Sequence, residues 1–381
     1  MKYLILSFFF YPEVNGISQS VFYRCKELAS RGNTVSLLVP GYPTLSEQSA
    51  VIILKSLGVR IIGMPLAVHC NPMTSPFPDH RCTRTLADEI ASFQPDVLLV
   101  DEPMPLYMDA GFCLSDIICI VPEPCLTIAL CHVDLASLCT NYGMSKDAAA
   151  INSKVDTIYG QYDAVFVPSV FLKNNYLINI NSTVVSFLGV DTEMFKPSLC
   201  HEVTDVMKVI YVGRLSREKN LHLFIDAAEN LREQGLNIEW TFVGSGPMLE
   251  TLETLSTSGN IRFMGERPSE IVAMELKRND LFITGCDFEA FGITVSEAMA
   301  CGLPVMTSHR GGNAEQYEHF SSGINFDIAD MDSLLNGMKY FYYHKAERIK
   351  MGEIARRSVT SWSMAVDNME IAISSLKNQC G

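Results

Sequence analysis

Residues 208–243 read KVIYVGRLSREKNLHLFIDAAENLREQGLNIEWTFV. Two mostly apolar runs of strand length begin and end this stretch, at 208–212 and 238–243. Between them, apolar side chains recur at helical spacing at Leu221, Phe224, Ile225, Ala228 and Leu231. Gly235 follows, where glycine commonly closes a helix. The stretch therefore predicts a β-loop-α-β unit, whose strands pair in parallel through a right-handed crossover.

The amino-terminal part of the chain repeats this pattern. A strand is expected over 3–9, a loop over 11–16, a helix from about 18 to 31 and a second strand over 34–39. Further strands are expected at 96–100, 164–167, 261–264, 280–284 and 304–307, with helical patterns between most of them. The sequence thus predicts an α/β protein with two doubly wound, Rossmann-like domains that face each other across a cleft.

The length of 381 residues supports two domains, since single cores stop growing near about 250–300 residues. We expect the first domain over 1–195 and the second over 196–360, with the boundary in the polar stretch 191–205. A last helix is expected within 361–381, and its membership of the second domain is left open.

Composition narrows the class of protein. Hydrophobic residues make up 48% of the chain, which excludes disorder, and the net charge of −14 lacks the basic surplus that nucleic-acid binding needs. The twelve cysteines include no Cys-x-x-Cys pair and no cluster at zinc spacing, so we expect reduced thiols and no metal site. No uncharged apolar run approaches about 20 residues. These features predict a cytoplasmic protein, with peripheral contact to a membrane left open.

The second domain contains charged residues where a ligand would bind. Arg214 and Lys219 lie in a loop before a helix, where they would clamp a diphosphate; scattered charges on a solvated loop are the alternative. A helix is expected from about Gly292 to Gly302, with Glu289 just ahead of it and Glu297 inside it. These carboxylates suit the hydroxyls of a sugar or ribose, or they merely complement the helix dipole.

The first domain offers weaker candidates. Gly16 stands where a backbone can approach a phosphate closely, although an ordinary turn would also explain it. His132 follows an apolar run, and at the end of a strand it would contact substrate; a core histidine is the alternative. The run Gly244-Ser245-Gly246 imitates a dinucleotide fingerprint, but Leu249 replaces its third glycine, which disfavours a nicotinamide dehydrogenase.

Taken together, these motifs resemble glycosyltransferase family 4, the retaining nucleotide-sugar transferases with the GT-B fold. The resemblance covers nearly the whole chain. Its nearest branch holds the sulfoquinovosyl- and digalactosyl-diacylglycerol synthases and the bacterial α-mannosyltransferases. The motifs that carry it are the loop 12–16, His132 with Tyr142 downstream, residues 189–197, 211–220 and 243–247, the pair Glu289 and Glu297, and residues 311–315.

The resemblance implies a role for each matching residue. Gly16 would donate its N–H to the distal phosphate of the donor, and Arg214 and Lys219 would neutralise the diphosphate. His132 would contact the sugar near the reacting carbon. For the rest of the donor it implies contacts from Glu289 and the backbone of Phe291, Gly292 and Ile293 to the sugar, from Glu297 to the ribose, and from the loop containing Arg267 to the base.

The implied activity is transfer of a hexose from a UDP- or GDP-sugar to a hydroxyl of a glycan or lipid, with retention, by a front-face mechanism that needs no metal or other cofactor. The first domain would face the acceptor, and the last helix would cross back to it. Three departures from the usual pattern occur, at Asn15, Leu188 and Ala290. A non-catalytic nucleotide-sugar or glycan binder is the alternative, while a nucleotide-sugar isomerase is disfavoured. The sequence leaves open the donor base, the sugar, the acceptor, the linkage and the oligomeric state.

Overall fold

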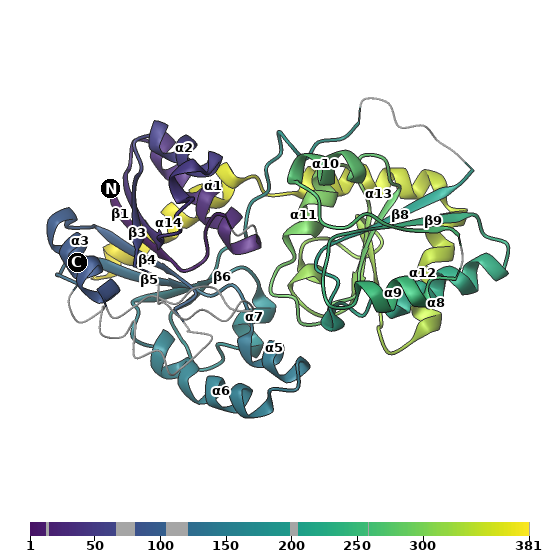
Figure 1. Cartoon of the computed structure of the whole chain (residues 1–381), viewed down its shortest axis with the longest axis horizontal. Coiled ribbons are helices and arrows are strands. Elements are labelled where there is room, and N and C mark those ends of the chain that lie inside the picture. The colour runs from purple at the N-terminus through teal and green to yellow at the C-terminus, as the bar shows by residue number, and fades with distance from the viewer. Residues whose placement is uncertain (13–14, 66–80, 104–120, 199–204, 258, 381) are drawn as a thin grey trace. The chain divides into compact units, whose positions relative to one another are not determined.

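The computed structural model describes residues 1–12, 15–65, 81–103, 121–198, 205–257 and 259–380 (Figure 1). The chain divides into two compact units. The first unit contains Met1–Leu188 together with Trp362–Gly381, and the second contains Gly189–Ser361. The change from one unit to the other thus falls seven residues before the expected position after residue 195. The two units are described separately below.

The first unit is built on a seven-stranded parallel sheet with the order β3-β2-β1-β4-β5-β6-β7. Its strands are β1 (Lys2–Ser7), β2 (Thr34–Pro40), β3 (Arg60–Met64), β4 (Val97–Asp101), β5 (Leu126–Leu130), β6 (Ala164–Val167) and β7 (Thr183–Val185). The first strand ends at Ser7, before the expected residue 9, because the Ser7 hydroxyl accepts a hydrogen bond from the Phe9 N–H and turns the chain. Strand order reverses between β1 and β4, as in doubly wound folds.

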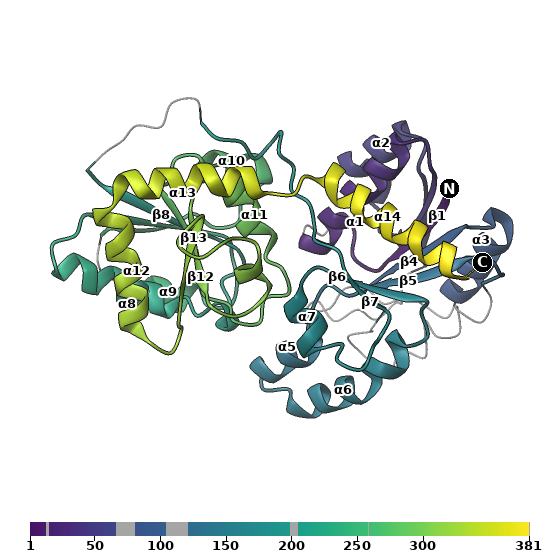
Figure 2. The same cartoon turned by 180° about the vertical axis from the view of Figure 1, so that it is seen from behind.

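Helices cover this sheet and include one from the far end of the chain. They are α1 (Gly16–Ser30), α2 (Ser49–Ser56), α3 (Arg81–Phe93), α5 (Leu135–Asn141), α6 (Ser145–Tyr159), α7 (Val170–Asn175) and α14 (Trp362–Cys380). Helix α14 lies beside α1 in both views (Figures 1 and 2). The Trp362 ring stacks on Tyr23 with centroids 5.3 Å apart, and Glu370 pairs with Arg31 at 2.9 Å. These contacts attach α14 to the first unit although it follows the second.

The second unit is built on a six-stranded parallel sheet with the order β10-β9-β8-β11-β12-β13. Its strands are β8 (Met207–Val212), β9 (Ile238–Val243), β10 (Ile261–Phe263), β11 (Leu281–Thr284), β12 (Val305–Ser308) and β13 (Gly323–Phe326). Its helices are α8 (His222–Glu233), α9 (Leu249–Leu255), α10 (Ser269–Leu276), α11 (Ile293–Ala300), α12 (Met331–Tyr343) and α13 (Lys345–Ser358). The prediction of two doubly wound, Rossmann-like α/β domains is confirmed.

Both faces of the second sheet are covered. Along β8, Val209 and Tyr211 pack into one apolar core, whereas Ile210 and Val212 pack into another. Because side chains of a strand alternate between its two faces, a strand buried on both sides reads as a continuous apolar run. This explains why β8 was evident from the sequence. It also leaves the carboxyl edge of the sheet as the place where polar side chains gather.

Candidate active site

Backbone hydrogen bonds at the carboxyl edge of the second sheet join the loops after β8, β9 and β10, and separately those after β11 and β12. The Asn220 side chain connects the two groups, because its Nδ2 donates to Gly285 O at 2.9 Å. Leu215 N–H, after β8, donates to Ser245 O at 2.8 Å, and Gly244 N–H, after β9, donates to Gly265 O at 2.9 Å. Gly312 N–H, after β12, donates to Glu289 O, after β11, at 2.6 Å. This bonding holds the candidate side chains on a connected backbone support.

Gly244 shows how closely these loops approach. A Cβ atom there would lie 1.9 Å from the Gly213 carbonyl oxygen, and its φ of +137° also disfavours a side chain. The glycine that imitates a dinucleotide fingerprint is therefore required by loop packing. No cofactor is needed to explain it.

Lys219 and Glu289 meet at this edge. Lys219 ends the short helical turn η2 (Arg217–Lys219), and its Nζ donates to Glu289 Oε2 at 2.5 Å. Both side chains keep some exposure, 17% for Lys219 and 28% for Glu289. Burial opposes the charge on Lys219 and is the largest single effect on its pKa. Glu289, together with Cys286 and Tyr211, outweighs burial, so the pKa of Lys219 lies well above its usual value. The ammonium thus remains protonated in a partly open position.

Side-chain hydrogen bonds hold the loop that carries Lys219. The Tyr211 hydroxyl donates to the Arg214 carbonyl oxygen at 2.8 Å, while the Arg214 side chain is exposed. Glu218 is buried and accepts from the Ser216 hydroxyl through Oε1. Its Oε2 is buried without a hydrogen-bond partner. No local sequence pattern singles out Glu218, because its burial depends on the folded loop.

Helix α11 starts beside Glu289. Gly292 precedes the helix with a φ of +78°, and a Cβ there would lie 3.2 Å from Glu289 Cγ. Gln316 Nε2 donates to the carbonyl oxygens of Phe291 and Gly292, which ties the turn to the next loop. The first N–H groups of a helix have no partner within it, so those of Ile293 and Thr294 suit an anion, whereas the Val295 N–H already donates to Gly292 O.

Glu297 lies inside α11 and is only 5% exposed. Burial raises its pKa to about 8, with no cation acting in the opposite direction. At neutral pH this carboxyl group is therefore largely protonated in the ligand-free protein. Hydroxyl groups that donate to it would favour the charged form. Arg267 lies in the exposed loop after β10, which joins the same backbone network through Gly265.

In the first unit, Gly16 opens helix α1. The Asn15 side chain accepts hydrogen bonds from the Ile17 and Ser18 N–H groups at 3.0 and 2.9 Å, and Ser18 Oγ accepts from Asn15 N–H at 2.8 Å. Asn15, one of the three departures from the expected motif pattern, thus forms a capping box at the start of α1. An anion at this turn would have the Gly16 N–H rather than those of Ile17 and Ser18.

His132 belongs to a buried charge network. Its Nε2 lies 2.7 Å from Asp101 Oδ1, and Arg24 Nη1 donates to both Asp101 oxygens at 2.9 and 3.0 Å. Asp101 is fully buried and Arg24 is 3% exposed. Burial raises the pKa of Asp101, but Arg24 and the hydrogen bond from His132 outweigh it, so the pKa stays below its usual value. Asp101 therefore fixes the orientation of the imidazole.

A second carboxylate completes this network. Glu102 Oε2 accepts from the His132 N–H at 2.9 Å, and Glu102 Oε1 accepts from the Tyr159 hydroxyl at 2.7 Å. Asp101, Glu102 and Arg24 were not predicted from the sequence. Two adjacent acids at the end of the apolar run of β4 were the available signal, because such acids need partners once buried.

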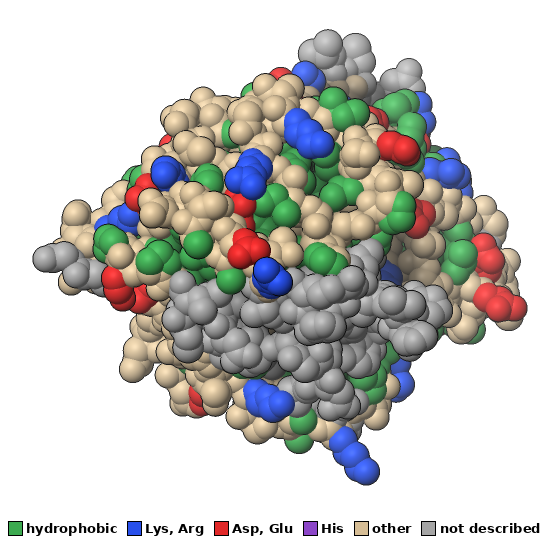
Figure 3. Space-filling model, turned by 60° about the vertical axis from the view of Figure 1, so that its left-hand side comes forward, with side chains coloured by type: hydrophobic (Ala, Val, Ile, Leu, Met, Phe, Trp, Pro, Cys, Tyr) green, Lys and Arg blue, Asp and Glu red, His purple; other side chains and the backbone are tan. Residues whose placement is uncertain are grey.

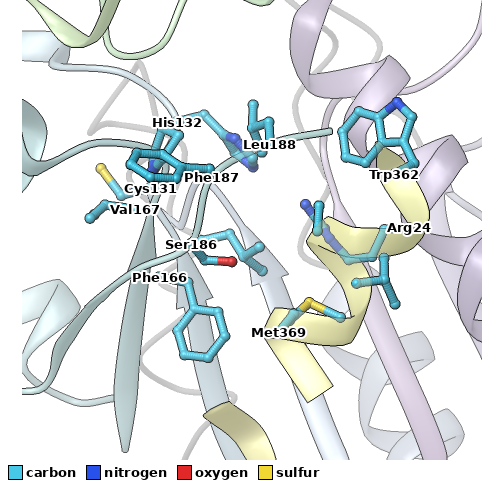
Figure 4. Close-up of a pocket in the computed structure, with 14 residues that line it drawn as sticks. Arg24, Cys131, His132, Phe166, Val167, Ser186, Phe187, Leu188, Trp362 and Met369 are labelled. Atoms are coloured by element: carbon cyan, nitrogen blue, oxygen red, sulfur yellow. The ribbon is translucent and has the colours of Figure 1, made fainter. Parts of the chain in front are cut away.

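A small pocket lies beside this network (Figure 4). Arg24 and His132 line it together with Phe187 and, from α14, Trp362 and Met369. Its volume of about 30 Å³ is close to that of one water molecule. The pocket is therefore too small for a sugar as it stands.

Three further observations concern the described residues, and a fourth concerns the surface charges. Among their helices, none has the length and apolarity that crossing a membrane requires. Within the same ranges, no group of three or more His, Cys, Asp or Glu is placed to hold a metal ion. Six cysteines there, beginning with Cys25, are buried. On the face shown in Figure 3, acidic and basic side chains are interspersed rather than gathered into one patch.

Two doubly wound parallel sheets are the architecture of the GT-B fold, which this chain shares with solved glycosyltransferase structures. Residues 201–358 match the family model described as glycosyl transferases group 1. The chain therefore contains a glycosyltransferase group 1 domain and is a transferase enzyme.

Individual relatives agree with this assignment. The chain is 25% identical over 375 residues to a GDP-mannose-dependent alpha-mannosyltransferase of Mycobacterium tuberculosis, covering 94% of this chain and 93% of that protein. It is 24% identical over 295 residues to a sulfoquinovosyl transferase of Arabidopsis thaliana, covering 73% of this chain. The match spans only 56% of the plant protein.

Among solved structures, sucrose-phosphate synthase from Thermosynechococcus elongatus shares the fold with a TM-score of 0.78 at 18% identity, covering 98% of each chain. The branch indicated by the sequence motifs, with sulfoquinovosyl transferases and α-mannosyltransferases, is confirmed by the two sequence relatives.

Proposed function

We propose that this enzyme transfers a hexose from a UDP- or GDP-sugar to a hydroxyl group of a glycan or lipid, with retention and without a metal. The observation that carries the proposal is the Lys219–Glu289 pair beside the start of α11. It combines a protonated ammonium, a sugar-binding carboxylate and free helix N–H groups at one edge of the sheet. The names of the mannosyltransferase relatives make GDP-mannose the first donor to test.

In the proposed reaction, the bond between the sugar and the diphosphate breaks and leaves negative charge on the diphosphate. Lys219 and Arg214 neutralise this charge, and the N-terminus of α11 adds a partial positive charge. Groups that are already in place and aimed at the developing charge make the largest contribution to catalysis. The two cations thereby do the work that a metal ion does elsewhere.

Glu289 has two tasks in this scheme. Without donor it orients Lys219 through their ion pair, and with donor it accepts from sugar hydroxyls, beside the backbone of Phe291, Gly292 and Ile293. Glu297 accepts from the ribose hydroxyls, and the loop with Arg267 lies against the base.

From the first unit, Gly16 donates its N–H to the distal phosphate and His132 contacts the sugar. Because Asp101 holds His132 Nε2, the ring nitrogen left for the sugar is Nδ1. The acceptor hydroxyl attacks the face from which the diphosphate leaves and passes its proton to the leaving phosphate oxygen, which retains the anomeric configuration.

The test begins with binding. UDP, GDP and ADP are added to the full chain, and unfolding is followed on heating; a ligand at about 100 times its Kd should stabilise the fold by about 2.7 kcal/mol. Sugars of the stabilising nucleotide are then assayed for transfer, with and without EDTA, and the anomeric configuration of the product is read by NMR. Inversion or loss of activity in EDTA would contradict the mechanism.

Matched variants test the residues. Arg214→Gln and Arg217→Gln remove the same charge from exposed positions of one loop, but only Arg214 belongs to the proposed site. We expect transfer to fall sharply in Arg214→Gln and to persist in Arg217→Gln. Nucleotide binding without turnover of any donor sugar would instead favour the second candidate, a non-catalytic nucleotide-sugar binder.

A lipid acceptor would need apolar contact with a membrane, since the chain has a net charge of −14. Helix α2 offers exposed apolar side chains at Ile52 and Ile53, 58% and 42% accessible. Cosedimentation with neutral vesicles, compared between the natural chain and a variant with serine at both positions, tests peripheral binding. Equal sedimentation of the two proteins would remove α2 from this role.

A further inference from the structure

The second unit contains a cavity of about 410 Å³ at the end of its sheet opposite the candidate active site. Asp280 and Pro304 line it, and these residues immediately precede β11 and β12. Glu289, in contrast, follows the carboxyl end of β11. Four residues of strand at about 3.3 Å each separate the two edges by roughly 13 Å. The cavity is thus a separate place, and its volume lies in the range of small-molecule sites.

Cations dominate the lining of this cavity. Four cationic and two anionic side chains contribute, which leaves an excess of two positive charges in a chain with a net charge of −14. The cations are Lys277, Arg348, Arg356 and Arg357, and the anions are Asp280 and Glu353. This local reversal of sign favours an anionic ligand.

One of the cations already has structural partners. Arg348 donates through Nη1 to the Phe341 carbonyl oxygen at 2.9 Å, and its Nη2 lies 3.3 Å from Asp280 Oδ1. Asp280 also accepts from the Lys208 N–H at 2.8 Å. Arg348 and Asp280 therefore neutralise each other, and their ion pair stabilises the lining of the cavity.

Arg356 differs, because its Nη1 is buried and has no hydrogen-bond partner. Buried donors are almost always paired, and a charged donor is costly to leave unpaired. Lys277 lines the same cavity, and both cations act on the Cys301 thiol, whose pKa burial nevertheless raises to about 12. Lys277 Nζ donates to Met194 O at 3.2 Å, which uses one of its three N–H groups.

The remaining lining charges do not neutralise these two. Arg357 and Glu353 face each other at 3.9 Å with 79% and 62% exposure, so their pairing is weak. An arginine fork and a lysine point charge together match the oxygens of a phosphate group. A phosphate monoester carries about −1.5 to −2 charges at neutral pH, which balances the local excess.

We propose that this cavity binds a small phosphate-bearing anion, whose phosphate group is held by Arg356 and Lys277. The volume admits a phosphate together with a body of sugar size. The site is independent of the proposed transfer reaction, because none of its lining residues belongs to the candidate active site.

The test uses the full chain and isothermal titration with two probes, inorganic phosphate and glucose 6-phosphate. Arg356→Gln and Lys277→Gln should each weaken binding about 10- to 100-fold, the loss expected for one charge-assisted hydrogen bond. Lys350→Gln is the matched control, because Lys350 is exposed on the same helix, α13, and does not line the cavity. Arg356→Lys should recover part of the affinity.

Arg214→Gln separates this site from the proposed diphosphate site, and it should leave phosphate binding unchanged. Tighter binding of glucose 6-phosphate than of phosphate would identify an organic phosphate as the ligand, and equal binding would identify the free ion. The proposal is overturned if neither probe binds, if both cavity variants bind like Lys350→Gln, or if Arg214→Gln abolishes binding. Circular dichroism of each variant shows whether it is folded. If Arg356→Gln does not fold, the binding of the probes to Lys277→Gln tests the proposal.

Discussion

The two units use basic side chains at the carboxyl edges of their sheets in opposite ways. In the first unit, Arg24 is 3% exposed and donates to both oxygens of Asp101, which also accepts from His132. In the second unit, Lys219 keeps 17% exposure and has a single carboxylate partner, Glu289. The Arg24–Asp101 pair is buried and has no partner to exchange, whereas Lys219 can exchange its partner.

The difference follows from where each cation stands in its β-loop-α unit. Arg24 is eight residues inside α1, on the side of the helix that packs on the sheet, so folding buries it. Lys219 precedes α8, in the loop itself, and remains near solvent. The same fold thus buries an arginine in one unit and keeps a lysine near solvent in the other.

Breaking the closed network should have the largest effect. Asp101→Ala leaves Arg24 buried without its carboxylate, so we expect the free energy of unfolding to fall by about 3–5 kcal/mol. Urea unfolding measures this loss. The control is Asp367→Ala, which removes an exposed partner of Arg31 and should cost no more than about 1 kcal/mol. Equal losses in the two variants would refute the structural role of Asp101.

Breaking the Lys219–Glu289 pair should lower the rate of transfer rather than the stability of the fold. Lys219→Met removes a preorganised cation from the proposed leaving group, so kcat should fall by about 100- to 1,000-fold, or 2.7–4 kcal/mol. Steady-state assays with the donor identified by binding measure this, with Arg217→Met as the control from the same turn. A kcat within threefold of the natural enzyme would remove Lys219 from the mechanism.

The two units should also respond oppositely to pH. Asp101 has a lowered pKa, so its stabilisation is present at neutral pH and is lost in acid. Glu297 has a pKa raised to about 8 by burial, against about 4.5 when exposed, so the native state holds its proton longer. The free energy of unfolding should therefore fall between pH 5 and 8, by at most about 1.4 kcal/mol per pH unit.

Glu297→Gln should remove this pH dependence, which urea unfolding at several pH values would show. A difference between variant and natural chain that stays constant from pH 5 to 8 would contradict the raised pKa. Donor binding should also release a proton near pH 7, if ribose hydroxyls stabilise the charged form. Titration calorimetry in buffers of different ionisation enthalpy detects that proton.

The smallest effect concerns the start of α1. Asn15→Ala removes the side chain that caps the Ile17 and Ser18 N–H groups, which should lower the free energy of unfolding by about 1 kcal/mol. Asn15→Asp keeps the acceptor and serves as the control. If Asn15→Ala were as stable as the natural chain, the capping box would have no energetic role.

The sequence was enough to predict the strands and helices where a long apolar run and its helix follow each other closely along the chain, as in β8, α8 and β9. It did not reveal β3, β7 or β13, which are short strands at the edges of their sheets and read like loops. The cations of the second unit were evident because the loop after a strand is a known ligand position.

The network of the first unit was not evident, since Arg24 and Asp101 are 77 residues apart and only the parallel sheet brings them together. The protonation of Glu297 depends on burial in α11, which no local pattern reports. The cavity near Arg356 was hidden for the same reason, because its lining comes from four separate segments.

The attachment of α14 to the first unit has a consequence for the order of folding on the ribosome. Synthesis delivers residues 189–361 before residue 362, so the second unit is complete while the first still lacks α14. Until then the face of α1 with Tyr23 and Arg31 has no cover from Trp362 and Glu370. The domain that begins first is therefore finished last, and its nascent form offers an apolar face to chaperones.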